Sequence, residues 1–265
     1  MSVNRASSAD RFSRSWCQPR RRPHRKGCCL DTRTPPDRPD PATYSQLEQL
    51  SLGIQPTWNS PDITTNFYSP YTLFKEPEFK VRNLSATASA VNTLVHVSTS
   101  PFGLGMQRTP LLSQVVTLGP SQEVTLLYPL PQAVLNGDQR IGVHVRIEHP
   151  HDKNKLNSVA SQIIFAVHTS QVGRNFQQQF PVLNFAGSPR AIQLSVLSSP
   201  LTASVSPAAH TYAPFEQLNA TLSVQVPNSL HGAPNNVLER EVTVVGRGPG
   251  GEVIDGITYV VRIDD

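Results

Sequence analysis

The sequence predicts an all-β protein in which two β-sandwiches follow a disordered, basic N-terminal tail. Charged residues make up only 16% of the 265-residue chain, which is low for a helical protein, because helices normally cover their outer faces with Glu, Lys and Arg. The 24 Pro and 15 Gly suit a chain with many turns and strand edges. Short segments of alternating apolar and polar residues recur between the turn signals, and no helical pattern extends over ten residues.

The N-terminal segment differs in composition from the rest. Residues 1–40 hold ten Arg or Lys and four Asp, a net charge of +6, whereas the remaining residues hold 13 basic and 15 acidic side chains, a net charge of −2. Such a segment cannot bury enough apolar surface to fold, so we expect residues 1–42 to be a disordered tail. A tether to nucleic acid or anionic lipid is the alternative. The near-neutral remainder lacks the basic surface that nucleic-acid binding requires.

The cysteines and the targeting signals of the sequence indicate which cellular compartments suit the protein. All three cysteines, Cys17, Cys28 and Cys29, lie in the N-terminal segment, so no disulfide can join two parts of the body. This suits a reducing compartment, or a secreted domain that is large enough to do without disulfides. No apolar run reaches the roughly 20 residues of a transmembrane helix. The basic start is followed by no apolar stretch, so we expect no secretion signal.

Residues 58–170 are the first predicted sandwich, and residues 43–57 are a linker with room for a short helix that ends at Gly53. The sandwich opens with WNSPDITTNFYSPYTLF, which is dense in aromatic residues and proline. We expect this segment to pack Trp58, Phe67 or Tyr71 against a sheet. Alternating apolar residues then predict strands within residues 78–84, 92–99, 121–130, 140–149 and 158–170.

The segment RIGVHVRIEH is the clearest of these strands. Apolar residues stand at every second position, so their side chains share one face: Ile141, Val143, Val145 and Ile147. The same spacing places His144, Arg146 and Glu148 on the opposite, outward face. The segment SVASQIIFAVHTS is predicted to return beside it, which makes HPHDKNKLN a turn between two strands.

Residues 171–265 are the second predicted sandwich. Strand patterns cover NFQQQFPVLNF, AIQLSVLSSP and LNATLSVQVP, and the chain ends in a predicted hairpin over residues 240–263. The loop of this hairpin, GRGPGG, matches the spacing of a dinucleotide-binding loop. A strand follows it where that function needs a helix, so we interpret it as a turn.

Several of these segments resemble a known group of modules. WNSPDI, followed by FKVRNLS with Asn83 just before a turn, resembles the start of bacterial immunoglobulin-like modules such as the cell-adhesion-related domain found in bacteria. The segments NKLNSVASQ, ATLSVQVP and GGEVIDGITYVVRI are similar to parts of these and related tandem modules. The resemblance implies tandem immunoglobulin-like sandwiches, a role in contact or spacing, and an extracellular or cell-surface location. It supplies no catalytic residue, and the absence of a secretion signal favours the cytoplasm instead.

The turn HPHDKNKLN holds the densest cluster of polar residues. His149, His151 and Asp152 can together supply three metal ligands, which makes a metal-dependent hydrolase the alternative function. His144 and Glu148 stand four residues apart, roughly 13 Å along a strand and too far for one ion. Exposed polar side chains at a strand end are the simpler interpretation, because catalytic ligands are usually held by rigid elements and by further hydrogen-bond partners. We therefore expect no metal and no cofactor.

The segment SPFGLGMQRTP is a predicted loop at one end of the first sandwich. It carries Phe102, Leu104 and Met106 among glycines. Exposed apolar side chains on a mobile loop would suit a contact with another protein, whereas the alternative is that they pack onto their own sheet.

Together these patterns favour a non-enzymatic structural or binding module that contacts a protein or a glycan through loops at the sandwich ends. Its candidate binding residues are Phe102, Leu104, Met106, His149, His151 and Asp152. An accessory component of an intracellular assembly, anchored by the tail, is a further alternative. The oligomeric state and the partner are left open.

Overall fold

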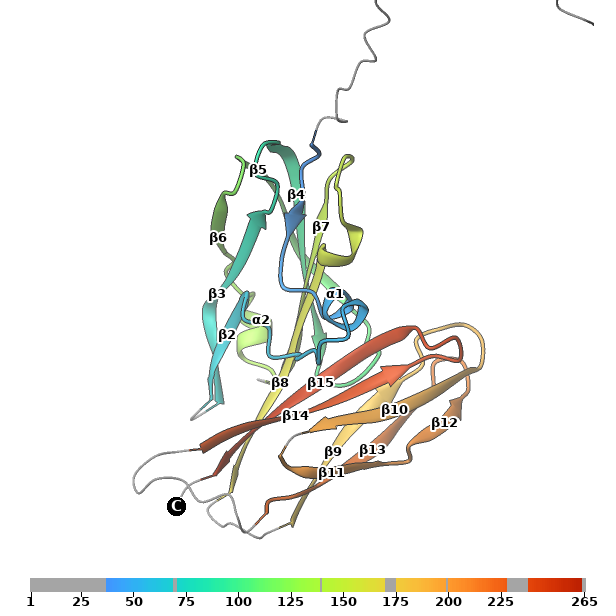
Figure 1. The fold of residues 1–265 in the computed structure, drawn as a ribbon. Helices are drawn as coiled ribbons and strands as arrows, with labels where there is room; N and C mark the ends of the chain where they lie inside the picture. Colours follow the sequence, from blue (N-terminus) through green and yellow to red (C-terminus); the bar gives the residue numbers. More distant parts are fainter. Residues whose placement is uncertain are drawn as a thin grey trace, which may run out of the picture. The chain divides into compact units, whose positions relative to one another are not determined.

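The structure, a computed structural model, describes residues 37–68, 71–138, 140–169, 175–198, 200–227 and 238–263, without the side chains of residues 66–68, 71–75 and 166–169. Strands dominate it, and the longest described helix, α1 (Gln46–Ser51), has six residues (Figure 1). The predicted all-β fold is therefore confirmed. The three cysteines and the predicted tail up to residue 36 lie outside the described residues.

Two sheets face each other in the first sandwich. One sheet contains β1 (Pro41–Ala42), β2 (Ile63–Tyr68), β3 (Tyr71–Asn83) and β6 (Glu123–Leu127). The other contains, in spatial order, β5 (Thr109–Leu118), β4 (Ala90–Pro101), β7 (Ile141–Glu148) and β8 (Val159–Thr169). Alternate side chains of β3, β4 and β7 point between the sheets and form the core: Phe79, Val81, Val95, Val97, Val143, Val145 and Ile147.

The second sandwich repeats this arrangement. One sheet has the order β11 (Thr202–Ser206), β13 (Gln217–Gln225) and β9 (Asn175–Leu183). The other has the order β12 (Ala209–Tyr212), β10 (Arg190–Ser198), β14 (Leu238–Arg247) and β15 (Val253–Ile263). β14 and β15 form the predicted terminal hairpin, in which Val242 pairs with Tyr259 and Val244 with Ile257.

Strand β8 belongs to both sandwiches. Residues 159–163 pair antiparallel with β7, and residues 164–169 pair parallel with β15. One sheet of eight strands therefore runs from β12 to β5 through both halves of the protein (Figure 1). The predicted boundary between the sandwiches, at residue 171, lies outside the described residues and stays a prediction.

The start of the described chain packs against the first sandwich. Pro41 and Ala42 pair with Asn83 and Arg82 of β3, so the predicted tail ends before residue 42. Composition does not reveal this short strand, because its partner lies about 40 residues further along the chain. Helix α1 follows, with the Ser45 side chain accepting a hydrogen bond from the N–H of Glu48. This agrees with the predicted short helix before Gly53.

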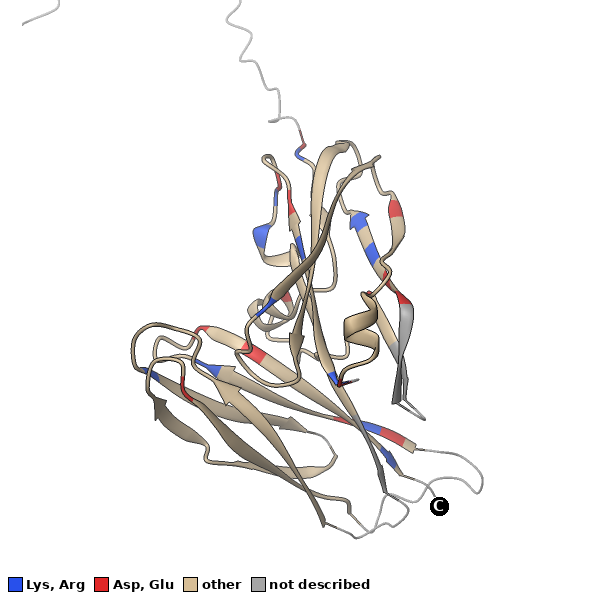
Figure 2. Cartoon of the chain, turned by 180° about the vertical axis from the view of Figure 1, so that it is seen from behind, with Lys and Arg blue, Asp and Glu red and all other residues tan. Residues whose placement is uncertain are grey.

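The part of the second sandwich that precedes β14, residues 175–227, carries very little charge. Residues 175–227 contain only two charged side chains, Arg190 and Glu216, and Figure 2 shows β9, β11 and β13 without charged residues. Their exposed residues are Gln, Asn, Ser and Thr, with Leu218 as the one large apolar side chain among them. Contacts with the sheet of β9, β11 and β13 must therefore depend on shape, apolar area and neutral hydrogen bonds rather than on electrostatic attraction.

Candidate binding site between the two sandwiches

The loop between β4 and β5 leaves the first sandwich and joins the second. Phe102 and Leu104 are 7% and 1% exposed, and both belong to the core of the second sandwich. The N–H of Leu104 donates to the carbonyl of Pro181, and the N–H of Leu183 donates to the carbonyl of Leu104, both at 2.9 Å. The expectation of exposed apolar contacts is thus wrong for these two residues, because the loop extends the edge of β9.

Two glycines allow this loop to approach β9 so closely. Gly103 and Gly105 have φ values of +148° and +68°, in the range that favours glycine. A Cβ atom at Gly103 would lie 2.8 Å from the carbonyl oxygen of Pro181, and one at Gly105 would lie 2.4 Å from that of Leu183. The Gly-Leu-Gly sequence is therefore the signal that this loop packs against a neighbouring backbone.

Trp58 fixes the lead-in segment to the same junction. Its side chain is 2% exposed, as predicted, and packs in the core of the second sandwich. The backbone N–H of Trp58 donates to Oγ1 of Thr258 at 2.7 Å, and its backbone carbonyl accepts the N–H of Ile163 at 3.0 Å. A Cβ atom at Gly256 would lie 2.5 Å from the indole ring, so only glycine leaves room for Trp58. Phe67 and Tyr71, the other predicted packing residues, have no described side chains.

Asp255 is a buried carboxyl group at the centre of this junction. Its Oδ1 accepts hydrogen bonds from Nε1 of Trp58 at 3.1 Å and from the N–H of Gly256 at 3.0 Å, and the N–H of Gly105 also donates to it. Burial raises the pKa of Asp255 from about 3.8 to about 6, although the charge of Arg108 and the three donors oppose this rise. Asp255 thus links the lead-in segment, the 102–108 loop and β15.

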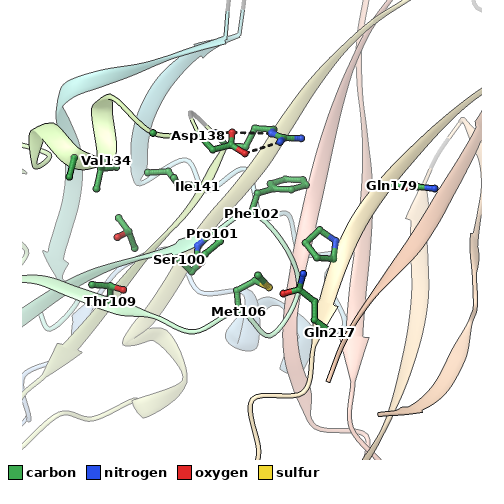
Figure 3. Close-up of a pocket in the computed structure, with 15 residues that line it drawn as sticks. Ser100, Pro101, Phe102, Met106, Thr109, Val134, Asp138, Ile141, Gln179 and Gln217 are labelled. Carbon is green, nitrogen blue, oxygen red and sulfur yellow. Dashed lines mark hydrogen bonds and ion pairs between the residues drawn. The ribbon is translucent and has the colours of Figure 1, made fainter. Parts of the chain in front are cut away.

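A pocket of about 610 Å³ opens beside this loop, between the two sandwiches (Figure 3). Its apolar lining consists of Pro101, Phe102, Met106, Ala133, Val134, Ile141 and Pro181. Met106 is half-buried and reaches the pocket from the loop, and Val134 comes from the short helix α2 (Gln132–Leu135). Of the three apolar loop residues predicted to bind, Phe102 and Met106 line the pocket, whereas Leu104 anchors the loop.

Polar groups surround the apolar lining of the pocket. The exposed amides of Gln179 and Gln217 come from β9 and β13, and the hydroxyl of Thr109 comes from β5. Arg140 and Asp138 form an ion pair at 2.7 Å, and the hydrogen bonds from Arg140 lower the pKa of Asp138 (Figure 3). An apolar floor with a few hydrogen-bonding groups at its rim is typical of sites that bind an apolar side chain and its flanking backbone.

The second predicted cluster, in the turn between β7 and β8, does not form a site for a metal ion. Nε2 of His149 lies 3.1 Å from the carbonyl oxygen of Val91, and its Nδ1 accepts the N–H of His151 at 3.2 Å. Oδ1 of the buried Asp152 accepts the N–H of Asn154, and its Oδ2 lies 3.5 Å from Nζ of Lys155.

The ligands assumed for a hydrolase therefore do not converge. Within the described part of the chain, no three His, Cys, Asp or Glu residues are grouped to hold an ion. An open hollow of about 630 Å³ adjoins the turn, but His149 is the only one of the three candidates in its lining. His149 and Asp152 are buried rather than exposed, because they hold the turn together, while His151 is exposed.

His144 differs from the prediction for the outer face of β7. It does share that face with Arg146 and Glu148, but it is only 2% exposed. Its ring nitrogens lie 3.0 Å from Oγ of Ser100 and 2.9 Å from Oγ of Ser161. Gln46 of α1 hydrogen bonds to the backbone of Ser161 and so covers this region. Burial lowers the pKa of His144 well below 6.5, and the positive charge of Arg108 acts in the same direction.

No protein-family model matches this chain, and no curated protein sequence matches it. Solved structures give weak likenesses. The ASH/PapD-like domain 7 of human CEP192 has a TM-score of 0.27 and 10% identity over 38% of this chain and 80% of that one. The E. coli chaperone DraB has a TM-score of 0.24 and 16% identity over 37% and 58% of the two chains. Native E. coli alpha-2-macroglobulin has a TM-score of 0.30 and 12% identity over 76% of this chain and 16% of that one.

Likenesses of this size assign neither a family nor a function to the chain. The immunoglobulin-like β-sandwich architecture rests on the strand order and the two cores described above. The resemblance to bacterial cell-adhesion-related domains stays a prediction. Among the described residues, no helix has the length and apolar character needed to cross a lipid bilayer.

Proposed function

We propose that the protein is a non-enzymatic binding module that holds a segment of a partner protein in the pocket between its two sandwiches. The observation that carries this proposal is the pocket of about 610 Å³, whose apolar floor is surrounded by amides, hydroxyls and one ion pair, Asp138–Arg140. A protein partner fits this lining better than a glycan does, because a sugar ring would bury its hydroxyls against Met106, Val134 and Ile141 without partners.

The pocket is built on rigid elements, which favours recognition without rearrangement. Phe102 is fixed by ring contacts with Phe165 and Tyr259, at 5.8 and 6.3 Å between centroids. Leu104 ties the same loop to β9 through two backbone hydrogen bonds. A site that is already formed loses little conformational entropy on binding, so a modest contact area can give useful affinity.

The partner segment expected here has one or two large apolar side chains. These side chains would contact Met106 and Val134, while the amides of Gln179 and Gln217 hydrogen bond to the backbone of the segment. Because the lining carries the Asp138–Arg140 ion pair and no other charge, a segment without charged residues at its centre should bind best.

A peptide library displayed on phage, selected on the full-length chain, tests this proposal. We expect enriched peptides to contain an apolar anchor and to bind Met106→Glu at least about tenfold more weakly than the wild type, because the new carboxylate would have to be desolvated. Gln177→Glu, an exposed position on β9 outside the pocket lining, is the matched control and should bind normally.

Two results would contradict the proposal. One is the absence of any enriched peptide, and the other is equal binding to Met106→Glu and the wild type. Thermal unfolding of both variants checks whether the substitutions leave the fold intact. Val134→Glu, on a different element of the same pocket, should reproduce the loss.

A further inference from the structure

Strand β5 is an unpaired edge of the eight-stranded sheet. β4 pairs with one side of it, and no described strand pairs with the other. It has ten residues, whereas β12 at the opposite edge of the sheet has four. Natural proteins usually protect long edges with charges, proline or bulges, because unpaired N–H and C=O groups invite a further strand.

The central part of β5 lacks these protections. The strand TPLLSQVVTL contains no charged residue, and Pro110 protects only its start. The pairing with β4 is irregular near both ends, but Leu112 to Val116 pair without interruption with Val97 to Thr93. Leu112 and Val115 are 46% and 59% exposed within this regular segment.

The side of the first sandwich next to β5 is also open. Thr65 of β2 hydrogen bonds to Gln162 of β8, so β2 and β8 flank one side of the sandwich and β5 and β6 flank the other. Apolar residues of β5 and β6 are only half-buried there, although they pack against the core: Leu111, Val116, Val124 and Leu126. A strand added to β5 would cover this apolar margin.

The register of β5 makes a second copy of the chain the fitting occupant. Leu112, Gln114 and Val116 face the sandwich interior, because they pair with the inward residues Val97, Val95 and Thr93. An antiparallel pair related by a two-fold axis at Gln114 therefore places Leu112 of one copy opposite Val116 of the other on the same face. On the other face of the sheet, Val115 of one copy lies opposite Ser113 of the other. No like charges oppose each other, since β5 carries none.

We propose that the protein forms a two-fold symmetric dimer through antiparallel pairing of β5 with β5 of a second copy, centred on Gln114. The pairing joins the two eight-stranded sheets into one continuous sheet. It satisfies the free backbone groups of β5 and buries Leu112 and Val116 at the side where the core is open. The surface is separate from the pocket, so this inference does not depend on the function proposed above.

Sedimentation of the full-length chain over the micromolar range tests the dimer. We expect a monomer–dimer equilibrium in the wild type. Gln114→Lys places two lysines opposite each other and should weaken it roughly fivefold or more. Gln114→Glu should do the same. An equal mixture of the two variants should form the dimer again, because Lys then faces Glu. Ser204→Lys, on the exposed edge strand β11, adds the same charge elsewhere and should leave the dimer unchanged.

A cross-linking experiment tests the register. In a background with the three native cysteines replaced by serine, Gln114→Cys should form an intermolecular disulfide under mild oxidation. Directly opposite Cβ atoms lie about 4.5–5.5 Å apart, so a small backbone shift brings them to the roughly 3.5–4.5 Å of a disulfide. Thr117→Cys, which would face Leu111 of the other copy, should not. A wild type that stays monomeric throughout the micromolar range overturns the proposal, as does a dimer that Gln114→Lys leaves unchanged.

Discussion

In the first sandwich, β5 follows β4 in the chain and lies beside it. In the second sandwich, the segment that follows β10 is divided into two strands, β11 and β12, which belong to different sheets. There β11 pairs with β13 of one sheet, and β12 then pairs with β10 of the other. Because β11 and β12 lie in different sheets, this segment covers one side of the second sandwich. The undivided β5 leaves the corresponding side of the first sandwich open. Two halves that are each built from two packed sheets thus present different edges to a partner.

The two sandwiches also share a buried asparagine clamp, formed by Asn83 in the first and Asn184 in the second. Asn83 and Asn184 stand at equivalent places, at the ends of β3 and β9, and both are 1% exposed. Each side-chain oxygen accepts the N–H two residues further on, and each amide donates to three carbonyls of the neighbouring turns. The asparagine clamp is common to both halves because it closes the turns at one end of each sandwich. The edge strands differ because the buried core does not determine them.

The largest expected effect comes from breaking either clamp. Asn83→Ala and Asn184→Ala should each lower the free energy of unfolding by roughly 4 kcal/mol, because buried carbonyls and N–H groups lose their partners. Urea denaturation measures the loss. Asn219→Ala, an exposed position on β13, is the control and should change it by less than about 0.5 kcal/mol. A stable Asn83→Ala variant beside a strongly destabilised Asn184→Ala variant would show that the two clamps are not equivalent.

A somewhat smaller effect is expected at the loop that enters the second sandwich. β3 has β2 and β6 on its two sides, but β9 has β13 on one side and the backbone of Leu104 on the other. Gly105→Ala forces a Cβ atom against the carbonyl of Leu183 and should cost roughly 3 kcal/mol. The amides of Leu104 and Leu183 should then exchange faster with deuterium. Gly187→Ala, where a Cβ atom meets nothing within 4 Å, should leave both stability and exchange nearly unchanged.

The smallest effect is a pH dependence that arises at the junction. Because the pKa of Asp255 is raised to about 6, the folded state holds this proton more tightly than the unfolded state does. Its contribution to stability is therefore greatest at low pH and falls as the pH rises, by about 2 kcal/mol between pH 4.5 and 6.5.

Asp255→Asn removes this titration while keeping an oxygen that can accept from Trp58. His144 acts in the opposite sense, since its lowered pKa reduces stability as the pH falls below about 6.5. The informative quantity is thus the difference between wild-type and variant unfolding free energies across the pH range. A difference that stays constant with pH would show that folding leaves the pKa of Asp255 unchanged.

Sequence patterns revealed the strands whose two faces differ strongly in burial. β7 was predictable because Val143, Val145 and Ile147 face a core and Arg146 and Glu148 face solvent. β5 was not predicted, since both its faces are largely exposed and its apolar residues do not alternate. A pattern of alternation can therefore find a strand inside a sandwich but misses the edge that a partner uses.

The junction was predictable only in part. The Trp58 lead-in was expected to pack on a sheet, but no local pattern indicates that Phe102 and Leu104 enter the core of the other sandwich. The burial of His144 likewise depends on Gln46, almost 100 residues away in sequence. Contacts of this kind are set by tertiary packing, which local periodicity does not encode, although the glycines around Leu104 give a partial signal.

Strand β8 has a mechanical consequence for any partner that contacts both halves. Tandem modules on a flexible linker can rotate independently, and a ligand that bridges them must arrest that rotation at an entropic cost. Here a change in angle would require rupture of the parallel ladder between residues 164–169 and β15. Load applied to one half is therefore transmitted through main-chain hydrogen bonds to the other, and a bridging ligand meets a spacing that is already set.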